Sequence, residues 1–235
     1  MRSLRNACVI AAAFCPALRA ADLRAKIVSD VVHYTDQDGQ RRTIDVGRKC
    51  TDLWSAPDGS VIAFIGIDQF DPRTPQTGPE IDKSGVYVAR RSDHFAPTRL
   101  PLKPITVRGI KWSIFRRPSV SPDGRTVYFE IPDSVVSSTL ISFSFSSAAV
   151  EPLGGTTDYC VVWDGKYSGR LLYQRRYIPE DATRGVEYRC YLRDSAGKET
   201  LVAAKCDLEE FAKTWSLRNG GVCTPPPFSR EWPQM

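Results

Sequence analysis

Four carboxylates between residues 68 and 84 of this 235-residue chain are the side chains whose types come nearest to a metal-binding set. They are Asp68, Asp71, Glu80 and Asp82, in a segment rich in proline and aspartate. Ca²⁺ takes several oxygen ligands held near one another, but this segment lacks the alternating ligand spacing of an EF-hand loop. We therefore expect a long solvated loop, with these four residues as weak metal candidates and no cofactor.

A loop of this length inside a compact domain is often a binding loop. The binding-surface candidates are Asp68, Phe70, Asp71, Glu80, Asp82 and Trp112. Trp112 comes before the second of the repeats described below. Its indole either stacks on a peptide or a sugar or packs in the core, as we expect for Trp54 and Trp163.

Nucleophilic catalysis has little support in the sequence. No G-x-S-x-G stretch is present, and that motif marks the nucleophile of α/β-hydrolases. The chain has two histidines, His33 and His94, and so few exclude a multi-histidine metal site. We assign no catalytic residue.

Charge and composition exclude several other classes. The hydrophobic fraction of 42% and the charged fraction of 25% are those of a globular protein. The net charge is +5, or +2 without Arg2, Arg5 and Arg19, which is too balanced to indicate nucleic-acid binding. The arginine pairs, such as Arg90-Arg91 and Arg116-Arg117, are expected at solvated strand ends, because neighbours on a strand point to opposite faces.

Residues 1–20 have the pattern of a secretory signal peptide. Arg2 and Arg5 precede twelve uncharged residues, 7–18, and small residues follow at Ala20 and Ala21. The apolar run is shorter than the ~20 residues that span a bilayer. We expect cleavage near Ala20, a periplasmic or secreted protein, and no transmembrane segment in the mature chain.

Export changes the interpretation of the cysteines, because oxidising compartments favour disulfides. Five cysteines remain after cleavage: Cys50, Cys160, Cys190, Cys206 and Cys223. An odd number leaves at least one thiol free or paired with another chain. Cys206 and Cys223 flank a predicted helix and are the disulfide candidates that would attach its two ends to the body, while the pairing itself stays open.

Two segments of the chain repeat the same strand-turn-strand pattern. Residues 53–65 align with residues 118–130. The turns are Pro57-Asp58-Gly59 and Pro122-Asp123-Gly124, in which proline, aspartate and glycine occupy successive positions that suit a type I turn. Alternating apolar residues follow each glycine, as a strand requires.

A weaker third copy has its turn at Gly169, 45 residues after Gly124, whereas Gly124 lies 65 residues after Gly59. A propeller blade takes roughly 40–50 residues, and the insertion at 68–84 accounts for the longer interval. Further strands are expected at 85–91, 139–145, 186–192 and 199–203. Gly154-Gly155 is expected to be a turn between blades.

The Pro-Asp-Gly turns, each followed by an apolar-aromatic strand, resemble the WD40-like β-propeller repeats of the TolB family, and also the propeller of prolyl oligopeptidases. The resemblance covers residues 29–203. It implies a sheet-built propeller in the bacterial periplasm and a role in binding partners of the cell envelope. The expected fold is therefore all-β and propeller-like, with about four blades, incomplete or open, and a short C-terminal helix.

The C-terminal region departs from the repeats. Asp207 and Glu210 form a capping-box pattern, and an apolar stripe predicts a helix over 207–219 that ends at Gly220. We expect a signal peptide at 1–20, a propeller-like domain at 21–205, and the helix with a proline-rich tail at 206–235. An N-terminal half blade at 31–46 can close a ring by pairing the chain ends. The alternatives are an open arc capped by the helix and completion by another chain.

The sequence thus predicts an exported, non-catalytic module that binds a protein or peptide of the periplasm. A propeller enzyme of the glycosidase or lyase type, with acidic residues on the ring face, is the alternative. An open arc also leaves unpaired strand edges, through which the chain can self-associate.

Overall fold

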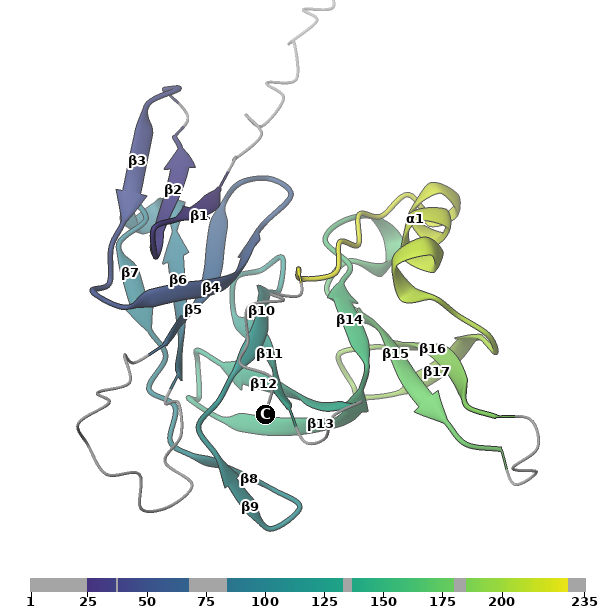
Figure 1. Ribbon diagram of the computed structural model, residues 1–235. Coiled ribbons are helices and arrows are strands. Elements are labelled where there is room, and N and C mark those ends of the chain that lie inside the picture. Colours follow the sequence, from purple (N-terminus) through teal and green to yellow (C-terminus); the bar gives the residue numbers. More distant parts are fainter. Residues whose placement is uncertain (1–24, 37, 68–83, 133–136, 180–184, 228–235) are drawn as a thin grey trace, which may run out of the picture.

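The computed structural model describes residues 25–36, 38–67, 84–132, 137–179 and 185–227. Within these ranges the chain forms three four-stranded antiparallel sheets, a three-stranded sheet, a two-stranded hairpin and one α-helix, α1 (Leu208–Asn219). The strands of each four-stranded sheet are consecutive in the chain and adjacent in the sheet, which is the meander of a propeller blade (Figure 1). The fold is all-β and propeller-like, as predicted.

The first blade is the sheet β4–β7, the second blade is β10–β13 and the third blade is β14–β17. The strands of the first blade are β4 (Lys49–Ser55), β5 (Val61–Ile67), β6 (Ser84–Arg90) and β7 (Pro97–Arg99). Those of the second blade are β10 (Arg116–Val120), β11 (Thr126–Pro132), β12 (Ser138–Ser144) and β13 (Val150–Thr156). Those of the third blade are β14 (Asp158–Val161), β15 (Leu171–Tyr177), β16 (Glu187–Arg193) and β17 (Glu199–Ala203).

Two smaller sheets accompany the blades. The N-terminal sheet consists of β1 (Lys26–Val28), β2 (Val31–Thr35) and β3 (Arg41–Ile44). The hairpin of β8 (Ile105–Val107) and β9 (Ile110–Trp112) connects the first blade to the second. It adds to the long interval between the first two repeats.

The blades stack because their strands are apolar on both faces. In β5, Ala63 and Ile65 face the second blade, while Ile62 and Phe64 face the N-terminal sheet. Successive side chains of a strand point to opposite faces, so a strand buried on both faces has a continuous apolar sequence. The apolar cluster between the first and second blades includes Trp54 and Trp163, whose rings lie 5.6 Å apart.

The helix α1 covers the free face of the third blade (Figure 1). Leu208, Ala212 and Trp215 form its buried stripe and pack on Leu172 and Leu192. The Asp207 side chain accepts a hydrogen bond of 3.0 Å from the Glu210 backbone N–H, and Gly220 ends the helix in the left-handed conformation. The predicted C-terminal helix is confirmed. No helix in the described ranges is long and apolar enough to cross a bilayer.

Among the described residues the ring does not close by pairing of the chain ends, so of the three alternatives the structure has the open arc. The strands of the N-terminal sheet pair with one another and with no strand of the third blade. The physical reason is that their apolar side chains, Val32, Tyr34 and Ile44, pack on the outer face of the first blade instead. The observed form is an open arc, with the N-terminal sheet covering one end and α1 the other.

Candidate functional site

Asp52 and Arg117 occupy equivalent positions at the inner ends of the first and second blades. Each lies in a bulge of the first strand of its blade, with positive backbone φ angles of 48° and 50°. The backbone N–H of Arg117 donates a hydrogen bond of 3.1 Å to Oδ2 of Asp52. Bulges redirect side chains and often accompany functional positions.

The Arg117 side chain is 5% exposed and is surrounded by acceptors. Its guanidinium binds Oε1 of Glu130 at 3.1 Å and a carboxylate oxygen of Asp158. Its Nε and Nη2 donate to the backbone carbonyl oxygen of Pro226 at 3.1 Å and 2.9 Å. This arginine therefore joins the second blade, the third blade and the C-terminal tail.

Burial shifts the pKa values of two members of the inner cluster, which consists of Asp52, Arg117, Glu130 and Asp158. Burial raises the pKa of Glu130 to about 7, although Arg117 lowers it, while Asp158 and Asp52 raise it further. Burial lowers the pKa of Arg117, but the carboxylates of Glu130 and Asp158 outweigh that effect and raise it above its ordinary value. Glu130 and Asp158 both form ion pairs with Arg117, so their role in this structure is to pair with a buried arginine.

Tyr159 completes the cluster. Its hydroxyl lies within donating distance of the backbone carbonyl oxygens of Arg117 and Tyr128, and Ser119 Oγ donates to it at 3.3 Å. Burial raises the pKa of Tyr159 well above its ordinary value. The phenol thus remains neutral and satisfies the carbonyl group of a bulged strand.

The tail after α1 lies against the inner strand of the third blade. Cys223 forms an isolated antiparallel bridge with Val162, and the Trp163 N–H donates to the Val222 carbonyl oxygen at 2.8 Å. A disulfide between Cys160 and Cys223 attaches the tail there. An extended segment is therefore already bound through its main chain at this edge.

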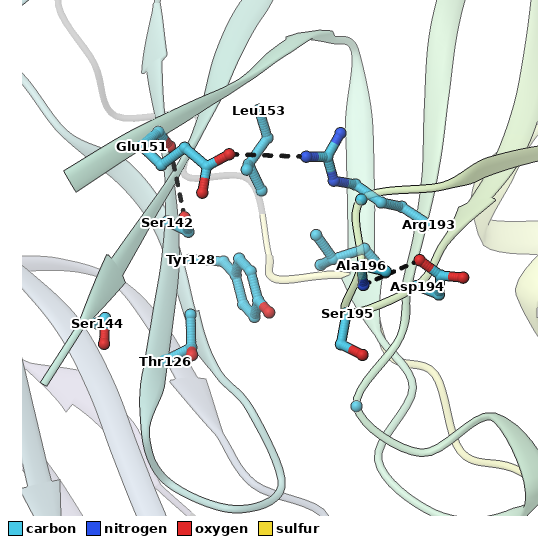
Figure 2. A pocket seen from close by; sticks show the side chains of 13 residues that line it. Thr126, Tyr128, Ser142, Ser144, Glu151, Leu153, Arg193, Asp194, Ser195 and Ala196 are labelled. Atoms are coloured by element: carbon cyan, nitrogen blue, oxygen red, sulfur yellow. Dashed lines mark hydrogen bonds and ion pairs between the residues drawn. The ribbon is translucent and has the colours of Figure 1, made fainter. Parts of the chain in front are cut away.

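A cleft of about 450 Å³ opens between the second and third blades (Figure 2). Its lining is mostly polar. The residues from the second blade are Thr126, Tyr128, Ser142, Ser144, Glu151 and Leu153. The residues from the third blade are Gly169, Leu171, Arg193, Asp194, Ser195, Ala196 and Gly197.

The Pro-Asp-Gly turns have the geometry that their sequence suggests. The Gly59 N–H donates to the Ala56 carbonyl oxygen at 2.9 Å, and the Asp58 carboxylate accepts from the Ser60 N–H at 2.9 Å. In the second repeat Gly124 and Asp123 make the same contacts with Ser121 and Arg125. Gly59 and Gly124 have φ angles of 67° and 69°, in the region that favours glycine, and Gly169 in the third repeat has 81°.

The pair Arg90-Arg91 connects these turns, which the sequence did not suggest. Arg91 Nη2 donates to the carbonyl oxygens of Asp58 and Gly59 at 3.1 Å and 2.7 Å. Arg90 Nη2 donates to the Gly124 carbonyl oxygen at 3.0 Å, and its guanidinium lies 4.1 Å from the centre of the Phe145 ring. Two neighbouring arginines of the first blade thus donate hydrogen bonds to the Pro-Asp-Gly turns of both the first and the second repeat.

Two expectations based on local pattern are wrong. Arg117 is buried rather than at a solvated strand end, because the bulge turns it toward Glu130 and Asp158. Gly154 and Gly155 lie within β13 rather than in a turn between blades. A Cβ on Gly154 would lie 3.4 Å from Nη2 of Arg175, and Nε of Arg175 donates to the Gly155 carbonyl oxygen at 3.3 Å.

The binding-loop and metal candidates Asp68, Phe70, Asp71, Glu80 and Asp82 lie outside the described residues, as does the expected signal peptide. Trp112 is described: it ends β9 and packs against the core between the first and second blades. In the described ranges no three His, Cys, Asp or Glu residues gather in a way that would hold a metal.

The disulfides attach both ends of α1 to the third blade. Cys206 before the helix is joined to Cys190, and Cys223 after it is joined to Cys160. Cys50 is a free, buried thiol, and burial raises its pKa to about 11.

No protein-family model and no curated protein matches the sequence. Among solved structures, the β-propeller domain of the Trilobed protease from Pyrococcus furiosus superimposes with a TM-score of 0.48 and 16% identity, over 78% of this chain and 53% of that one. TolB from Acinetobacter baumannii gives 0.47 and 16%, over 79% and 42% of the two chains. A gluconolactonase from Xanthomonas campestris gives 0.43 and 18%, over 78% and 58%. The chain spans less than two thirds of the length of each of these proteins.

Proposed function

We propose that this protein is an exported, non-catalytic, propeller-like module that binds a protein or peptide of the bacterial periplasm by adding an extended segment to a strand edge. The observation that carries the proposal is the outer edge of the third blade. β17 is an edge strand without proline or lysine in it, and its Leu201 is 49% exposed. Exposed edges of this kind are templates for pairing with another chain.

The other outer edges carry residues that oppose such pairing. β7 begins with Pro97, β13 contains Pro152, and β3 carries Arg41 and Arg42. Proline lacks the N–H that a ladder needs, and charge on an edge disfavours association. β17 carries one charged residue, Glu199, which is already bound by Arg175 and Arg193. Of these outer edges, β17 is therefore the best suited to a partner.

Two further observations support the proposal. The tail residues Val222 and Cys223 already bind along the inner edge of the third blade through main-chain contacts. The two disulfides support an oxidising compartment, because such cross-links persist in exported proteins.

The test is capture of partners by residues 21–235 from a periplasmic extract of the source organism, followed by mass spectrometry. The variant is Leu201→Lys, which places a charge on the β17 edge, and the matched control is Leu217→Lys, at a leucine of α1 that is 88% exposed. We expect one stoichiometric protein with the wild type and the control, and its loss with Leu201→Lys. Capture of nothing, or equal capture by all three, contradicts the proposal.

Self-association is a separate outcome of the same experiment. If the captured chain is this protein itself, and Leu201→Lys converts an oligomer to a monomer in light scattering, the partner is a second copy. A monomer that captures a different protein supports the periplasmic partner.

A further inference from the structure

A rigid donor lies in the cleft between the second and third blades. Arg193 Nη1 is 3.2 Å from Oε1 of Glu199, and Glu199 is also bound by Nη1 and Nη2 of Arg175, both at 3.3 Å. The Arg175 guanidinium lies 5.2 Å and 5.3 Å from the ring centres of Tyr173 and Tyr191. This chain of contacts fixes the direction of Arg193 before any ligand arrives.

The opposite wall of the cleft provides an exposed acceptor. Oε1 of Glu151 is 3.9 Å from Nη2 of Arg193, which exceeds hydrogen-bonding distance, and the Glu151 side chain is 68% exposed. Figure 2 shows this pair facing across the cleft. One ligand hydroxyl between them can accept from Arg193 and donate to Glu151 at the same time, because a hydroxyl does both.

Further hydroxyl groups converge on the same space. Tyr128 points across the cleft toward the turn that contains Ser195 (Figure 2). Among the described residues, no hydrogen bond is formed by the hydroxyl of Tyr128, Thr126 or Ser195. Burial raises the pKa of Tyr128 to about 12, so its phenol stays protonated and can donate.

The charges of the lining disfavour other ligand classes. Arg193 and Arg175 share the carboxylate of Glu199, and with Glu151 and Asp194 three carboxylates surround these two guanidinium groups. This excess of negative charge disfavours an anionic ligand. The Asp194 carboxylate accepts the N–H groups of Ala196 and Lys198 at 3.0 Å and 2.9 Å, so it is committed to its own turn. The apolar lining is limited to Leu153, Leu171 and Ala196.

We propose that this cleft binds a neutral, polyhydroxylated ligand of the size of a mono- or disaccharide. Its volume of about 450 Å³ lies within the usual range of small-molecule sites, and its leucines can contact the carbon atoms of a sugar ring. The turn before β17 lines this cleft and Glu199 of β17 holds Arg193, but Leu201 is not among the lining residues. The site therefore does not depend on the partner proposed for the β17 edge.

The test is an NMR titration of residues 21–235 with glucose, maltose, cellobiose and trehalose. The variants are Glu151→Gln and Tyr128→Phe, and the matched control is Glu209→Gln, at an exposed glutamate of α1. We expect at least one of these sugars to shift resonances of the cleft, with affinity weakened about tenfold by either variant and unchanged by the control.

The proposal is overturned if none of the four sugars shifts the cleft resonances, or if both variants bind as the wild type does. Glucuronic acid is the matched anionic probe, and a dipeptide blocked at both ends is the amide probe. Tighter binding of either one than of glucose also overturns the ligand class. None of these results bears on capture through β17, which is measured separately.

Discussion

The backbone N–H of Arg117 donates a hydrogen bond of 3.1 Å to the carboxylate of Asp52, and the two residues occupy the same position in successive repeats. The same repeat position in two successive blades thus provides the donor and the acceptor of a hydrogen bond between the blades. Because the side chain at this position is aspartate in one blade and arginine in the next, the second copy also recruits Glu130, Asp158 and the tail. The charged residues of the inner cluster therefore gather around Arg117, between the second and third blades.

Arg117→Met should lower the free energy of unfolding by about 3–5 kcal/mol, because it leaves the buried Glu130 without its cation. Urea denaturation at pH 7 measures the change. The control Arg176→Met alters an exposed arginine of β15 and should stay within about 0.5 kcal/mol of wild type. Equal losses in the two variants would refute the role of Arg117 as an organiser of the inner cluster.

The stability should fall as the pH rises from about 4.5 to about 7. The folded-state pKa of Glu130 is about 7 and its ordinary value is 4.5, so the folded state binds more protons in this window. The stabilisation by the bound proton is complete below 4.5 and is lost as the pH rises through 7. Glu130→Gln should flatten this part of the profile, measured as unfolding free energy against pH, and an unchanged slope would contradict the assignment.

Substitution of both Cys160 and Cys223 with alanine should lower the free energy of unfolding by about 4 kcal/mol, because their disulfide closes a loop with a sequence separation of 63. Removal of Cys190–Cys206, with a separation of 16, should cost about 3 kcal/mol. Thermal or urea unfolding gives both values. Cys50→Ala, which breaks no cross-link, is the control, and a loss as large as either disulfide would argue against this pairing.

Cys50 should resist iodoacetamide at pH 8 in the folded protein. Its thiol is buried and its pKa is raised to about 11, so little reactive thiolate forms. In urea without reductant, mass spectrometry of residues 21–235 should show one added carbamidomethyl group. Rapid labelling of Cys50 in the folded chain, or addition of more than one carbamidomethyl group in urea, would contradict this prediction.

Gly59→Ala and Gly124→Ala should each destabilise the protein by about 1–2 kcal/mol, because both glycines have left-handed backbone conformations. Gly155→Ala is the matched control: its φ is not in that region and a Cβ there would meet no atom within 4 Å. Urea midpoints of the three variants test this, and a control as damaging as the two turn variants would disprove the explanation.

The turns of the repeats, the strands beside them and the helix could be predicted from the sequence because their signals are local. The apolar run after Gly59 indicates the strand β5, and Pro122-Asp123-Gly124 specifies its own turn through contacts within a few residues. Asp207 likewise caps α1 through Glu210, three positions away. Such signals survive in a single sequence because the interacting groups are neighbours in the chain.

The site depends on contacts between distant residues, and only the tertiary structure decided these. Arg117 contacts Asp158 and Pro226, which lie 41 and 109 positions away, and no local pattern distinguishes it from the neighbouring Arg116. The disulfide partners, the role of Gly154 and Gly155 beside Arg175, and the facing of Glu151 and Arg193 also arise only when two blades meet. The physical reason is that a strand pattern encodes which side is buried, but not which residue of another strand it will meet.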